Sequence, residues 1–178
     1  MIRLFAAVAI PEDIGDGLAR RQQGLPGARW RPLESLHLTL RFFGELSEDK
    51  ADDLDAALAT IAGPAFDLAL SGVGVFEDGV GPRAVWAGAE DNPLLKRLAG
   101  RCESAARRAG LAPDRRPFRA HVTLAYLAGA DPARVAAWVQ EHNLLKSPPI
   151  PVQAFGLYSS RRGEAVAVYR LERRYALV

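Results

Sequence analysis

The chain has 178 residues, of which 49% are hydrophobic and 25% charged, and its formal net charge is +2. This length suits one domain with a sizeable core, and so small a net charge excludes a polybasic nucleic-acid coat protein. The apolar residues 1–10 are too few to cross a membrane, so we expect a buried first strand rather than a secretory signal, and no membrane partner. A single cysteine, Cys102, excludes an internal disulfide and a cysteine cluster for zinc, and favours a cytoplasmic location.

Strand-like and helix-like segments alternate along the chain. Runs of apolar or alternating residues predict strands at residues 1–10, 36–43, 66–70, 84–88, 121–126, 152–158 and 165–171. Helix-start signals followed by apolar residues at helical spacing predict helices that begin at Pro11, Ser47, Asn92-Pro93 and Asp131-Pro132. Gly63-Pro64 and Gly110 are the expected ends of the second and third helices, and Cys102 lies on the apolar face of the third as a core thiol. Locally connected strands with helices between them favour an α+β fold over a doubly wound sheet.

Two strands carry the most informative residues. His37-Leu38-Thr39-Leu40 and His121-Val122-Thr123-Leu124 repeat one pattern, once in each half of the chain. Because strand side chains alternate between faces, each strand buries its aliphatic residues and presents a histidine and a threonine on the opposite face. On that face the alternation also places Arg41 in the first strand and Arg119 next to the second. The order strand, helix, strand around both histidines indicates two related lobes.

Chance does not explain the repeated His-x-Thr pattern. The chain contains three histidines and three threonines, and two of the threonines follow a histidine by two positions. Random placement would produce this with odds of about one in a thousand. The third histidine, His142, ends a predicted helix and has no threonine after it, so we leave it out of the candidate site.

The pattern fits the opening of a cyclic phosphodiester. That reaction needs a base to activate water and an acid to protonate the departing ribose oxygen, and a histidine with a pKa near 6.5 can do either. Thr39 and Thr123 can donate hydrogen bonds to non-bridging phosphate oxygens. Arg41 and Arg119 can neutralise charge that develops in the transition state. Phe5, Phe43 and Trp30 are candidates for stacking on a base.

Several longer segments strengthen this interpretation. Beside the two His-x-Thr-x motifs, we note residues 3–8, 30–45, 82–86, 118–125 and 157–160. In these segments the chain resembles the two-histidine (2H) phosphoesterase superfamily and, more closely, the bacterial and archaeal RNA 2′,3′-cyclic phosphodiesterases, also called 2′–5′ RNA ligases. Two positions depart from the pattern: Ala120 replaces a frequent proline, and Tyr126 replaces a frequent arginine.

The resemblance implies one domain over residues 1–178, made of two pseudo-symmetric lobes. Its two antiparallel-rich sheets would line a central cleft, with the helices outside. It also implies hydrolysis of RNA 2′,3′-cyclic phosphate ends to 2′-phosphate without metal or cofactor. His37 would be the proton donor and His121 the proton acceptor, with Thr39 and Thr123 holding the phosphate. Arg41, Arg119 and Phe5 are the further expected substrate contacts. The expected partners are RNA ends or small cyclic nucleotides, bound by a monomer.

Other functions remain as alternatives. The same fold can serve RNA-end binding or 2′–5′ ligation as its main role, although mere binding requires no acid–base pair. A zinc hydrolase needs a third ligand at suitable spacing, which the sequence does not offer. A nucleotide-binding protein needs a glycine-rich phosphate loop after a strand, whereas Gly72-Val73-Gly74 is isolated and more typical of a turn.

Overall fold

The computed structural model describes residues 1–163 and 166–178. Along the chain the elements are β1 (Ile2–Ala9), α1 (Glu12–Ala19), β2 (Arg29–Trp30), the 3₁₀ turn η1 (Leu33–Ser35), β3 (His37–Leu46), α2 (Glu48–Ala59), β4 (Phe66–Leu68), β5 (Leu70–Glu77), β6 (Pro82–Ala89), α3 (Pro93–Arg108), β7 (His121–Tyr126), α4 (Pro132–His142), β8 (Ile150–Val152), β9 (Ala154–Arg161) and β10 (Val168–Ala176). The α+β class is confirmed, and the strand pairings are antiparallel.

Within the described residues, eight strands form one sheet in the order β10-β9-β1-β3-β7-β6-β5, with β2 paired to β7. The two sheets expected from the sequence are therefore joined. The connection between the two halves is narrow, because β3 and β7 pair at one described position, Leu38 with Val122. A separate two-stranded sheet consists of β4 and β8.

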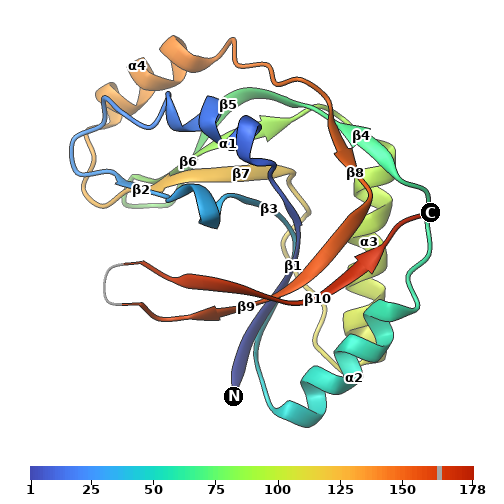
Figure 1. Ribbon diagram of the computed structural model, residues 1–178. Helices are drawn as coiled ribbons and strands as arrows, with labels where there is room; N and C mark the ends of the chain where they lie inside the picture. The colour runs from blue at the N-terminus through green and yellow to red at the C-terminus, as the bar shows by residue number, and fades with distance from the viewer. Residues whose placement is uncertain (164–165) are drawn as a thin grey trace.

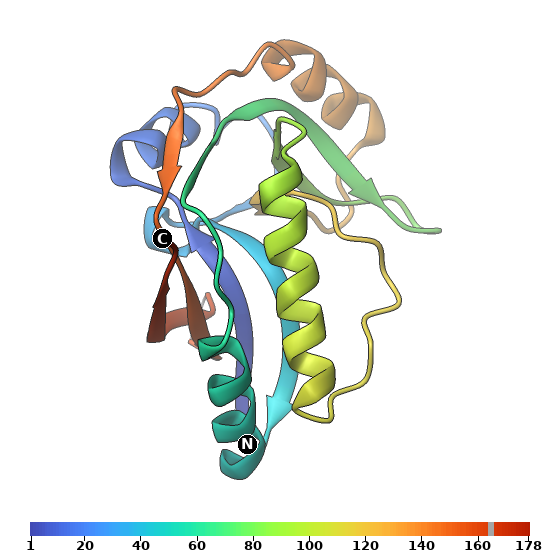
Figure 2. The same ribbon diagram turned by 90° about the vertical axis from the view of Figure 1, so that its right-hand side faces the viewer.

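The helices cover the sheet from outside (Figures 1 and 2). Helices α2 and α3 lie side by side, α3 against β3 and α2 against β1, while α4 packs against β5 at the opposite end of the molecule. The periodicity of α3 explains its placement: Leu95, Leu98, Cys102 and Ala105 recur at helical spacing and are all buried. No helix in the described ranges combines the length and the hydropathy needed to cross a membrane.

The helices begin where the sequence signals place them, but the side chains at the N-cap positions do not all make a capping hydrogen bond. Asn92 caps α3 by accepting hydrogen bonds from the backbone N–H groups of Leu94 and Leu95, at 3.0 and 3.1 Å. Ser47 occupies the N-cap position of α2, yet its side chain makes no capping hydrogen bond. Helix α2 also ends at Ala59, earlier than the predicted stop.

Two strand predictions and one turn prediction need correction. Residues 66–70 belong to two strands, because β4 pairs with β8 whereas β5 begins at Leu70 and pairs with β6. Residues 152–158 are likewise divided, between the end of β8 and β9. Gly72-Val73-Gly74 lies within β5 instead of a turn; Gly72 takes a φ of +70° where the register with β6 shifts, a conformation that favours glycine. The last predicted strand began at Ala165, which lies outside the described residues, and β10 begins at Val168.

Candidate active site

The Leu38–Val122 pair brings the two His-x-Thr motifs together. Both side chains are 0% exposed, so the residues on either side of them point to the opposite face of the sheet. Because the strands run antiparallel, His37 lies toward Thr123 and Thr39 lies toward His121. The junction therefore places two copies of the motif next to one another in opposite directions.

All seven residues that the sequence predicts for the site line one cavity of about 1050 Å³. They are Phe5, His37, Thr39, Arg41, Arg119, His121 and Thr123. The other two stacking candidates lie elsewhere: Phe43 is a buried core residue, and Trp30 packs against Trp138 at 6.1 Å between ring centroids. Strand alternation near a shared junction explains why the predicted residues converge on one cavity.

Aromatic rings surround His37. The centroid of its imidazole lies 4.6 Å from the ring of Tyr158, 5.6 Å from Tyr169 and 6.0 Å from Phe5. This burial lowers the pKa of His37 below 6.5, the nearby Ser35 carbonyl opposes that effect, and the positive charge of Arg31 adds to it. The Nδ1 atom is buried and has no hydrogen bond of good geometry among the described residues.

Apolar rings also surround His121, and in addition a polar contact orients its imidazole. Phe76 meets it edge-on at 4.8 Å, and Trp86 lies at 6.1 Å. Burial again lowers the pKa, here that of His121, and the Arg119 carbonyl partly offsets this effect. That carbonyl oxygen lies 2.7 Å from Nδ1 of His121. Because a carbonyl only accepts, the neutral ring carries its proton on Nδ1 and leaves the Nε2 lone pair free to take a proton.

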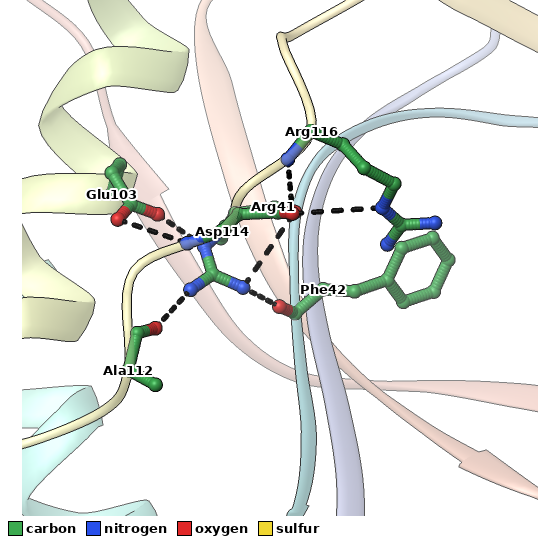
Figure 3. A network of polar contacts seen from close by, with 6 residues as sticks. All are labelled: Arg41, Phe42, Glu103, Ala112, Asp114 and Arg116. Carbon is green, nitrogen blue, oxygen red and sulfur yellow. Dashed lines mark hydrogen bonds and ion pairs between the residues drawn. The ribbon is translucent and has the colours of Figure 1, made fainter.

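Arg41 makes its polar contacts with the protein. Its guanidinium donates to the Glu103 carboxylate and to the carbonyls of Phe42 and Ala112, the last at 2.8 Å, and it lies 3.9 Å from Asp114 (Figure 3). These contacts tie β3 to α3 and to the loop that leads into β7. These contacts use three of the five N–H donors of Arg41. Because Arg41 also lines the cavity, the phosphate contact expected from the sequence stays a prediction beside this structural role.

The other two expected substrate contacts differ in exposure. Arg119 is exposed at the cavity, where its charge is available to an anion. Phe5 is only 2% exposed and stacks on Tyr158, with 5.5 Å between ring centroids. This packing supports the wall beside His37 and leaves Phe5 little surface for a base.

Sequence reasoning assigned no role to four further side chains of the cavity wall. Phe42 and Tyr126 are 43% and 39% exposed, while Arg31 and Tyr169 lie beside His37. Phe42 and Tyr126 belong to the motif strands β3 and β7 but lie outside the His-x-Thr pattern. Arg31, which precedes η1, and Tyr169 on β10 come to the cavity from distant parts of the chain, so no motif spacing marks them. In the part of the chain that the structure describes, no three His, Cys, Asp or Glu side chains cluster as a metal site.

Comparisons with known proteins agree with this geometry. The sequence profile of the LigT-like phosphoesterase family matches residues 8–86 and again residues 89–169. An Archaeoglobus fulgidus protein named RNA 2′,3′-cyclic phosphodiesterase is 29% identical over 89% of this chain and 91% of its own. An Escherichia coli protein of the same name is 36% identical over 68% and 70%. The crystal structure of E. coli LigT complexed with 3′-AMP superposes with a TM-score of 0.82 at 31% identity, covering 99% and 98%. The chain therefore belongs to the LigT-like phosphoesterase family.

Proposed function

We propose that this chain hydrolyses RNA 2′,3′-cyclic phosphate ends to 2′-phosphates, with His37 as general acid, His121 as general base and no metal ion. The observation that carries the proposal is the antiparallel placement of both His-x-Thr motifs in one cavity. The names of the A. fulgidus and E. coli relatives support the substrate, and the 3′-AMP bound by E. coli LigT supports a nucleotide site.

The proposed reaction is an in-line displacement at phosphorus. His121 Nε2 takes a proton from water as the water oxygen forms a bond to phosphorus. The bond from phosphorus to the ribose 3′ oxygen breaks, and His37 gives that oxygen a proton, which leaves a 2′-phosphate. Thr39 and Thr123 donate hydrogen bonds to the two non-bridging oxygens, one from each side of the junction.

The tautomer and the surroundings of the histidines support this division of roles. The Arg119 carbonyl keeps the proton of neutral His121 on Nδ1, which suits a base that accepts at Nε2. The apolar rings around both histidines shield the imidazoles from bulk solvent, so hydrogen bonds to the phosphate are strengthened there.

The size of the cavity favours an RNA end over a small cyclic nucleotide alone. Its volume of about 1050 Å³ slightly exceeds the roughly 300–1,000 Å³ typical of small-molecule sites. Lys96 and Arg119 in its wall can contact backbone phosphates of a longer chain. Both motifs come from one chain, so we propose that a monomer of one domain suffices.

A short RNA ending in a 2′,3′-cyclic phosphate tests the proposal. Phosphorus NMR should show conversion to a 2′-phosphate, and His37→Ala and His121→Ala should each lose about 10²–10⁴-fold in rate. His142→Ala is the matched control, because its ring packs against Trp138 and should leave the rate unchanged. A 3′-phosphate product, or histidine variants as active as the parent, would refute the proposal. Adding RNA with a 5′-hydroxyl end tests whether 2′–5′ ligation is instead the faster reaction.

A further inference from the structure

Arg31 is a buried charge in the cavity wall. The residue is 7% exposed and lines the same cavity as His37. Its backbone is held from two sides: its N–H donates to the Leu124 carbonyl at 2.8 Å, and its carbonyl accepts from the Gln22 side chain at 2.8 Å. Since Leu124 belongs to β7, Arg31 has a fixed position relative to the second motif.

Two tyrosines hold the guanidinium. Its central carbon lies 5.4 Å from the ring centroids of both Tyr126 and Tyr169, and Nη2 donates a hydrogen bond of 3.0 Å to the Tyr169 hydroxyl. Aromatic faces attract a cation without neutralising it, and they suit the planar, weakly hydrated guanidinium. These contacts orient Arg31 and leave its full charge in place.

No carboxylate in residues 1–163 and 166–178 forms an ion pair with Arg31. Two other arginines of the cavity wall do have such partners: Arg41 is paired with Glu103, and Arg116 with Asp114. A buried cation without an anion is unfavourable, and a guanidinium has five N–H donors, of which Arg31 uses one in a hydrogen bond. An anion that enters the cavity would remove this cost.

We propose that Arg31 is the principal anion-binding residue of the cavity and holds the substrate phosphate next to His37. This inference rests on the proposed function. A phosphate oxygen replaces the missing carboxylate and accepts from the free donors of the fork. The same contact favours the acid role of His37: the unpaired charge of Arg31 opposes protonation of His37, and a bound phosphate offsets that repulsion.

Binding of inorganic phosphate to the protein tests the proposal without any turnover. Arg31→Gln should weaken phosphate binding, measured by calorimetry, about 10- to 100-fold, because it removes charge-assisted hydrogen bonds. Arg116→Gln is the matched control; it removes an exposed arginine that has its own carboxylate, and should change the affinity less than about twofold. Equal phosphate affinity for the parent and Arg31→Gln would overturn the proposal, whether or not the protein hydrolyses cyclic phosphates.

A relocated charge separates phosphate binding from a purely structural role. The ring of Tyr126 lies next to the Arg31 guanidinium, so Tyr126→Arg places a new guanidinium in nearly the same space. In the double variant Arg31→Gln/Tyr126→Arg, phosphate affinity should return to within about tenfold of the parent. If Arg31 only ordered the tyrosines, the second substitution would restore nothing. Should Arg31→Gln fail to fold, Arg31→Lys keeps the charge and should lose only part of the phosphate affinity. A complete loss of phosphate binding in Arg31→Lys would count against the proposal.

Discussion

Leu38 in β3 pairs with Val122 in β7, and neither side chain is exposed to solvent. This pair is where the two halves of the sheet meet, and the four motif side chains extend from its opposite face. The pair therefore serves the core on one side and determines the spacing of the site on the other.

Shortening a junction residue should affect both stability and rate. Leu38→Ala removes buried methyl groups and should cost about 2–5 kcal/mol in the free energy of unfolding, measured with urea. Leu58→Ala in α2 is the matched control, since it removes the same fully buried side chain far from the junction. Both variants should lose stability, and Leu38→Ala should lose more activity under conditions where both are folded. Equal residual activity would contradict a positioning role for the junction.

The lowered pKa values of the histidines predict an acidic optimum for kcat/KM. A base must begin neutral, so kcat/KM rises with pH through the pKa of His121; an acid must begin protonated, so it falls above the pKa of His37. Burial holds both below 6.5 in the free protein, and the maximum should therefore lie below pH 6.5. The limbs belong to the coupled pair. The kcat profile should be displaced to higher pH, because a bound phosphate anion favours protonation; an alkaline maximum for kcat/KM would count against the roles proposed here.

A better leaving group distinguishes the acid from the base. A phosphodiester that releases p-nitrophenolate needs no proton on the departing oxygen. It should partly rescue His37→Ala and do little for His121→Ala, as measured by the ratio of each variant's rate to the parent's. Rescue of His121→Ala alone would reverse the assignment. The double histidine variant should be little slower than either single variant, because the two groups act as a unit.

Chelation tests the metal-free mechanism. The proposed reaction obtains its proton transfers from His37 and His121 and its charge stabilisation from Thr39, Thr123 and Arg31. Initial rates should therefore be unchanged after exhaustive treatment with EDTA. Loss of activity that Zn²⁺ or Mg²⁺ restores, while a dialysed sample without EDTA stays active, would disprove this mechanism.

The Arg41–Glu103 contact should be measurable as a coupling energy. Arg41→Met and Glu103→Gln, alone and together, form a double-mutant cycle of unfolding free energies, and residues in one network typically couple by about 0.5–3 kcal/mol. Because Arg41 ties β3 to the loop before β7, its loss should raise KM more than it lowers kcat (Figure 3). Coupling near zero, together with a loss of phosphate affinity like that of Arg31→Gln, would instead return Arg41 to the phosphate-binding role expected from the sequence.

The sequence by itself determined the α+β class, the helix starts at Pro11 and Asn92, and the two His-x-Thr strands. These features are local: strand alternation decides which face a side chain occupies, and the fixed φ of Pro11 and the capping oxygen of Asn92 each favour a helix start. For the same reason the sequence could place His37 and His121 on the face opposite the core. Each lies one residue from an aliphatic residue of its own strand, Leu38 or Val122, and both of those are fully buried.

Only the tertiary structure decided which strands pair and which charges meet. Residues 66–70 divide between two strands because their partners, β8 and β6, lie far apart in the chain. Arg41 and Arg31 are both arginines near the first motif, yet Arg41 lies against the carboxylate of Glu103 on α3, whereas Arg31 lies between two tyrosine rings. The pairing of a charge depends on side chains brought near it by the packing of distant elements, and no local period in the sequence records those contacts.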